Sequence, residues 1–141
     1  MISKILCGGI AAIALLATSA AFAQEMKMKA DLTGAQEVPP VTTQGKGSAE
    51  VTFDPASKKV SWTVTYSGLS GPATAAHFHG PAEPGKNAGV AVPIPNQAKS
   101  PVTGSANFTD AQAADLQAGR YYINIHTAAN PSGEIRGQVT K

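Results

Sequence analysis

The clearest strand pattern in the sequence is the stretch Lys58-Lys59-Val60-Ser61-Trp62-Thr63-Val64-Thr65-Tyr66-Ser67-Gly68-Leu69. Apolar and hydroxyl side chains alternate along it from residue 60 to residue 67, which is typical of a strand with one buried face. Residues 45–53, just upstream, alternate in the same way. Between the two segments lies Asp54-Pro55-Ala56-Ser57, with proline in its favoured turn position. This arrangement predicts an antiparallel hairpin.

The rest of the chain repeats this pattern in short segments separated by Gly, Pro and Asn. Further strands are expected at residues 24–33, 74–82, 102–108, 120–128 and 134–141. Residues 90–94 alternate too, but Pro93 marks them as an edge strand or a loop. One short helix is expected at residues 109–118, because Thr109 and Gln112 have the spacing of a capping box and Gly119 suits the C-terminal end.

Many short strands with one helix favour an all-β fold, an antiparallel β-sandwich in a single domain. The apolar positions that face inward would form a core between two sheets. The expected core residues are Val51, Phe53, Trp62, Val64, Phe78, Ile123, Ile125, Ile135 and Val139.

Residues 1–23 have the pattern of a secretory signal peptide. Lys4 supplies the positive start, residues 10–16 are apolar, and Ala21-Phe22-Ala23 matches the small-x-small cleavage pattern. The apolar run is too short for a membrane-spanning helix. We therefore expect a mature domain at residues 24–141, periplasmic or secreted, with no membrane insertion after cleavage.

Composition excludes several classes of function. The single cysteine, Cys7, lies in the signal segment, so no disulfide stabilises the mature domain. Without Lys4, the chain has ten basic and nine acidic residues and no basic patch, which argues against a nucleic-acid partner. No nucleophile–base pair, carboxylate pair or phosphate-binding loop can be recognised, which favours a protein that is not an enzyme.

The three histidines of the chain fall in two of the expected strands. His77 and His79 flank Phe78, while His126 follows Ile123 and Ile125. Residues two apart in a strand share a face and lie roughly 6.5–7 Å apart. If Phe78 and the two isoleucines face the core, all three imidazoles lie on the side away from it.

Two interpretations of this pattern remain open. Imidazole suits copper and zinc, and three histidines with an open position form a known zinc arrangement, so His77, His79 and His126 are candidate metal ligands. Asn124 or Glu134 would then orient a ring from outside the ligand set. Alternatively the rings are structural, and bond to loop carbonyls or to the region of Glu83.

Three segments of the mature chain carry a resemblance to a known family. They are Leu32-Thr33-Gly34-Ala35-Gln36-Glu37-Val38-Pro39-Pro40, Ala76-His77-Phe78-His79-Gly80-Pro81-Ala82, and residues 121–127 together with 130–138. With them the chain resembles the CHRD domain, named after chordin, which implies a β-sandwich in an exported protein and implies little about activity. Chordin binds growth factors through cysteine-rich modules that this chain lacks, so that role is not transferred.

The architecture is expected to be Greek-key, immunoglobulin-like or similar to Cu/Zn superoxide dismutase, which also has a His-x-His strand in a secreted sandwich. That enzyme has more metal histidines, an aspartate ligand and a disulfide. Three histidines and no mature cysteine cannot build its dinuclear site, and likeness of fold does not establish activity.

The favoured function is an exported, non-enzymatic binding or structural module with a protein or matrix partner that the sequence does not identify. The histidines and the Pro/Gly/Asn-rich residues 81–89 would form its interaction surface. The alternative is a copper- or zinc-binding protein that uses His77, His79 and His126. A metal-dependent oxidoreductase is a third hypothesis.

Overall fold

The computed structural model describes residues 23–141, so the expected signal peptide lies outside the described residues except for residue 23. Eight strands and two short helical segments follow one another in the described part. They are β1 (Met26–Thr33), η1 (Gly34–Gln36), β2 (Lys46–Asp54), β3 (Lys59–Ser67), β4 (Ala73–His79), β5 (Val90–Pro93), β6 (Val102–Asn107), α1 (Asp110–Gln117), β7 (Tyr122–Thr127) and β8 (Ile135–Gln138).

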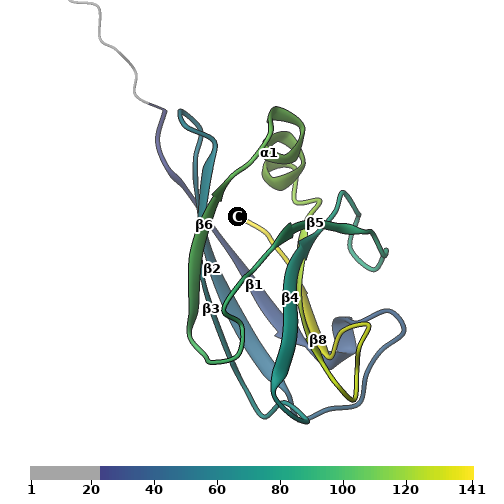
Figure 1. Ribbon diagram of the computed structural model, residues 1–141. Coiled ribbons are helices and arrows are strands. Elements are labelled where there is room, and N and C mark those ends of the chain that lie inside the picture. The colour runs from purple at the N-terminus through teal and green to yellow at the C-terminus, as the bar shows by residue number, and fades with distance from the viewer. Residues whose placement is uncertain (1–22) are drawn as a thin grey trace, which may run out of the picture.

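The strands form one antiparallel sheet in the order β5-β4-β7-β8-β1-β2-β3-β6. The shortest pairing is between β8 and β1. Within these two strands a single pair of residues, Thr33 and Arg136, lies opposite each other. The sheet folds over at this junction into two facing layers, with α1 across one end (Figure 1). The prediction of an antiparallel all-β fold with one short helix is confirmed.

Apolar side chains from both layers meet in the space between them. All nine of the expected core residues are buried. Trp62 of β3 packs edge-on against Phe78 of β4, with ring centroids 5.4 Å apart, so an aromatic contact joins the two layers. A Cβ atom on Gly104 would lie 2.8 Å from the Trp62 ring, which explains why the neighbouring strand β6 has glycine at this position.

Local signals set the ends of the helical segments. Thr109 and Gln112 form the expected capping box of α1, and Gly119 has a φ of 73°, as a residue just beyond a helix end often does. Residues 34–36 form the short 3-10 helix η1. Glu37 caps the C-terminal end of η1 and is thereby held against the sheet, with 6% of its surface exposed.

The register between β4 and β7 positions the histidines. His77 lies opposite Asn124, and His126 lies opposite Ala75. Phe78 and Ile125 are fully buried on the core face of these strands. Because successive residues point to opposite faces of a strand, the imidazoles lie on the other face.

Candidate metal centre

The three imidazoles form one cluster. One ring nitrogen from each of His77, His79 and His126 lies within 4.8 Å of the corresponding atoms of the other two. The closest pair is Nδ1 of His77 and Nε2 of His126, which are hydrogen-bonded at 3.0 Å. Two histidines from β4 and one from the adjacent strand β7 therefore converge on a shared point.

The histidine cluster is largely buried, although it lies on the face of the sheet away from the core. His79 and His126 are each 8% exposed, and His77 is intermediate. The loop of residues 80–89 and the turn of residues 128–134 provide the carbonyl groups that bond to these rings. The expectation that the rings lie away from the core is correct, and on that side His79 and His126 are buried beneath these two segments.

Backbone carbonyls fix the protonation of two of the rings. Nδ1 of His79 lies 2.9 Å from the Ala88 oxygen, and Nδ1 of His126 lies 2.8 Å from the Pro131 oxygen. A carbonyl oxygen can only accept, so both Nδ1 atoms carry the hydrogen and the neutral rings keep their lone pairs on Nε2. Nε2 of His79 is buried and has no hydrogen-bond partner. This is the usual arrangement of a metal-binding histidine, whose other nitrogen donates to a carbonyl or carboxylate.

Burial keeps the rings of His77 and His79 neutral near neutral pH. It lowers the pKa of His77 below its ordinary value of 6.5, and neighbouring charge on His126 and His79 lowers it further. Burial also lowers the pKa of His79, against the opposing effect of its bond to Ala88. Neutral imidazole is the form that binds metal, so these two rings are available as ligands at pH 7.

The loop over the cluster is attached to the sheet by Arg136 and Tyr122. The Arg136 guanidinium donates to Oδ1 of Asn87 at 2.7 Å and to the Lys86 oxygen, and lies 3.5 Å from the centre of the Tyr122 ring. The Tyr122 hydroxyl bonds to both the N–H and the oxygen of Ala88, and its ring stacks on His79 with centroids 4.9 Å apart. These contacts hold the Ala88 carbonyl against His79.

Asn124 and Glu134, the two residues expected to orient a ring, have different surroundings. Asn124 is 3% exposed, and its amide influences the pKa of His79. Both carboxylate oxygens of Glu134 are instead occupied by Thr43, Ser70 and Thr127, with donor–acceptor distances of 2.6 to 2.9 Å. Glu134 thus joins two loops to the end of β7, and none of these four donors is a histidine.

Glu37 is a neighbour of the cluster that the sequence did not indicate. Burial raises the pKa of its carboxyl to about 7, although the charge of Arg136 and the nearby Asn124 amide act in the opposite direction. Glu37 and Asn124 are far apart in the sequence and meet through the pairing of β7 with β8 and the fold of η1. An isolated acid next to Val38-Pro39-Pro40 was the available signal, and it is a weak one.

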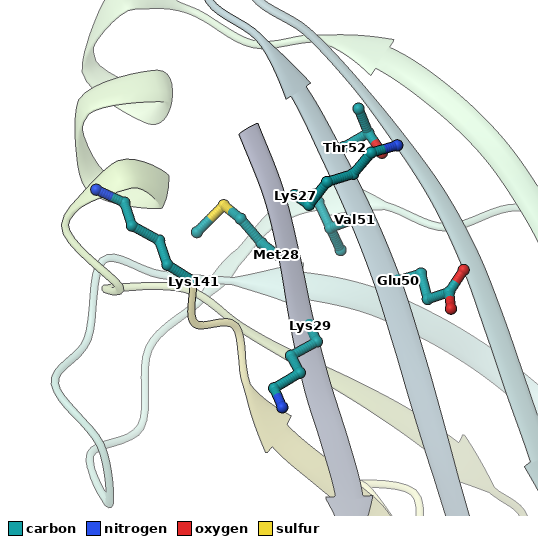
Figure 2. Close-up of a pocket in the computed structure, with 7 residues that line it drawn as sticks. All are labelled: Lys27, Met28, Lys29, Glu50, Val51, Thr52 and Lys141. Atoms are coloured by element: carbon teal, nitrogen blue, oxygen red, sulfur yellow. The ribbon is translucent and has the colours of Figure 1, made fainter. Parts of the chain in front are cut away.

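A separate hollow of about 420 Å³ lies beside β1 and β2, away from the histidines. Lys27, Lys29 and Lys141 contribute to it together with Glu50. Figure 2 shows that the three ammonium groups point away from one another, so they do not converge on an anion. The histidine cluster is the stronger candidate site.

The family comparison covers nearly all of the described chain. The model of the CHRD domain matches residues 28–139, a range that includes all three histidines, Glu37 and Asn124. No curated protein and no solved structure gave a match. Among residues 23–141, no helix has the length and apolar character needed to cross a bilayer.

Proposed function

The chain belongs to the CHRD domain family, and we propose that this member is an exported protein that binds copper or zinc through His77, His79 and His126. The observation that carries the proposal is the orientation of the rings. Two of them donate from Nδ1 to backbone carbonyls, which leaves their lone pairs on Nε2. Nε2 of His79 is buried without a partner, and Nε2 of His126 accepts from Nδ1 of His77, a bond that a metal would replace. The proposed setting is the periplasm or the cell exterior, because residues 1–23 have the pattern of a signal peptide.

The distances are compatible with a metal of this size. Zinc–nitrogen bonds of about 2.0–2.1 Å at tetrahedral angles put ligand nitrogens roughly 3.3 Å apart. Nδ1 of His77 and Nε2 of His126 are 3.0 Å apart, and one nitrogen from each of the three rings lies within 4.8 Å of the others. Small side-chain rotations are therefore sufficient to bring the three nitrogens to ligand distances. An all-imidazole set favours copper or zinc over magnesium or calcium, which prefer oxygen ligands.

Direct titration tests this proposal. The exported protein is expected to bind one equivalent of Zn(II) or Cu(II) with a Kd below about 1 μM, as measured by competition with a chromophoric chelator. The competing function, a binding module whose histidines are purely structural, predicts no stoichiometric binding. If the chelator keeps all of the metal when protein, chelator and metal are equimolar, the metal proposal is contradicted and the binding module is favoured.

Zinc affinity is also expected to depend on pH in one direction. Since the pKa values of His77 and His79 lie below 6.5, these rings need no deprotonation at pH 7, and affinity should change little between pH 8 and pH 7. As the pH falls further and rings become protonated, affinity should drop by on the order of tenfold per pH unit for each protonated ring. Competition titrations from pH 8 to pH 5 measure this. An affinity that stays constant to below the pH at which the rings of the metal-free protein become protonated would exclude imidazole ligands.

A further inference from the structure

Three buried polar atoms near the histidines have no hydrogen-bond partner within the described residues. They are Oε1 of Glu37, Nε2 of His79 and Oδ1 of Asn124. Buried polar atoms are nearly always paired, so a group of unpaired ones calls for an explanation, such as a bound ion or water. The metal proposed above accounts for the His79 atom and leaves the two oxygen atoms unexplained.

Asn124 connects Glu37 to the histidines. It lies opposite His77 in the register of β4 and β7, its amide nitrogen donates to the Ser132 oxygen at 3.4 Å, and its side chain is near enough to His79 and Glu37 to shift the pKa of each. The Cβ position of Gly133 would be 2.5 Å from both Nδ2 of Asn124 and Oε1 of Glu37, so these two atoms border the same small space. Glycine at residue 133 leaves that space open.

Among residues 23–141, no cation is paired with Glu37 alone. Arg136 is its nearest positive charge, yet the Arg136 guanidinium is engaged by Asn87, Lys86 and the Tyr122 ring. Within residues 23–141, Glu37 takes part in none of the salt bridges. A buried carboxylate without its own counterion is costly, and a nearby divalent ion would remove much of that cost.

We propose that Glu37 is a positioning and charge-balancing residue of the metal centre, acting through the Asn124 amide. This inference rests on the proposed function. In the metal-bound state the ionised carboxylate would accept from Nδ2 of Asn124, which borders the same space, and Oδ1 would then face the bound ion rather than the lone pair of His79. The negative charge of the carboxylate offsets that of the bound ion, so metal binding and ionisation of Glu37 favour each other to the same extent.

The test is Glu37→Gln, which keeps the size of the side chain and removes its charge. Zinc affinity is expected to fall by about 10- to 100-fold, the usual effect of losing a residue that supports a ligand from outside. The metal-free variant should be at least as stable as the parent at pH 8, because the variant lacks the buried charge. Its advantage in urea midpoint should shrink towards pH 5, where the parent Glu37 is protonated. A purely structural role would lower stability and affinity together.

Glu83→Gln is the matched control. Glu83 belongs to the loop that covers the histidines, but its side chain is 70% exposed and 3.5 Å from Arg120. The zinc affinity of the Glu83→Gln variant should stay within about twofold of that of the parent, since exposed charges are well screened. If the parent binds zinc and the Glu37→Gln variant binds it with the same affinity, this inference is overturned and the proposed metal site still stands. Parent protein that binds no zinc would instead overturn the proposed function.

A double-variant cycle tests the route through Asn124. If Glu37 acts through this amide, Asn124→Ala should weaken zinc binding, and the combined variant should be little weaker than Asn124→Ala alone. Fully additive losses of affinity would show that Glu37 acts independently of Asn124 and would contradict that part of the inference.

Discussion

Zinc affinity is expected to fall by more than about 100-fold when His126 is replaced by alanine. His126 is the ligand that β7 contributes, and its Nε2 lies 3.0 Å from Nδ1 of His77. Without it, two rings remain on a single strand, where alternate residues lie roughly 6.5–7 Å apart along the chain. Loss of a direct ligand should exceed the 10- to 100-fold effect of losing an outer partner. Chelator competition at pH 7.5 measures the change.

His77→Ala keeps this prediction falsifiable if the His126 variant folds poorly. His77 is less buried than the other two rings, and its replacement should disturb the loops least, yet it should cost a comparable amount of affinity. Glu50→Gln, on the exposed side of β2, is a control that should bind zinc as the parent does. Well-folded His77→Ala and His126→Ala variants with parental affinity would show that the metal binds elsewhere.

Glu134→Gln is expected to lower the free energy of unfolding by about 3 kcal/mol at pH 7. Glu134 is fully buried, and its two carboxylate oxygens accept four hydrogen bonds from Thr43, Ser70 and Thr127. Glutamine offers one oxygen in place of two, and its amide nitrogen would face donors that the second carboxylate oxygen accepts from in the parent. Urea unfolding of parent and variant measures the difference.

The effect of Glu134→Gln should also depend on pH. Burial alone would raise the pKa of Glu134, but hydrogen bonds from Ser70, Thr127 and Thr43 outweigh it and lower the pKa to about 2. The folded state therefore holds fewer protons than the unfolded state between about pH 2 and 4.5, so this stabilisation is complete above 4.5 and is lost as pH falls through 2. The gap between parent and variant should close over that range. An equal gap at pH 7 and pH 2 would mean that the carboxylate charge is not what stabilises the loops.

The strand pattern was sufficient to predict the fold class and the face on which the histidines lie. Alternation along residues 60–67 defined one face of β3, and the apolar residues Phe78, Ile123 and Ile125 defined the core side of β4 and β7. The capping box at Thr109 and Gln112 located the helix to within one residue. These are local signals, and each of them acts within a few residues of the chain.

The surroundings of the histidines were not predictable in this way. Glu37 meets Asn124 because η1 turns its side chain inward, and Arg136 meets Tyr122 because β8 pairs with β7. Periodicity describes which face a residue takes but says nothing about which distant loop covers that face. Glu134 shows the same limit: its four donors come from three separate segments, so its strongly bonded carboxylate could not be distinguished from a solvated charge in the sequence.

The most direct test of the metal centre is long-range ¹H–¹⁵N correlation spectroscopy of the imidazoles, recorded without and with one equivalent of Zn(II). The chain has three histidines, so every signal belongs to the proposed site. The predicted result is that His79 and His126 carry hydrogen on Nδ1 in the metal-free protein and keep it there, while their Nε2 resonances move on addition of zinc. Ring spectra that do not change on addition of zinc would contradict the account.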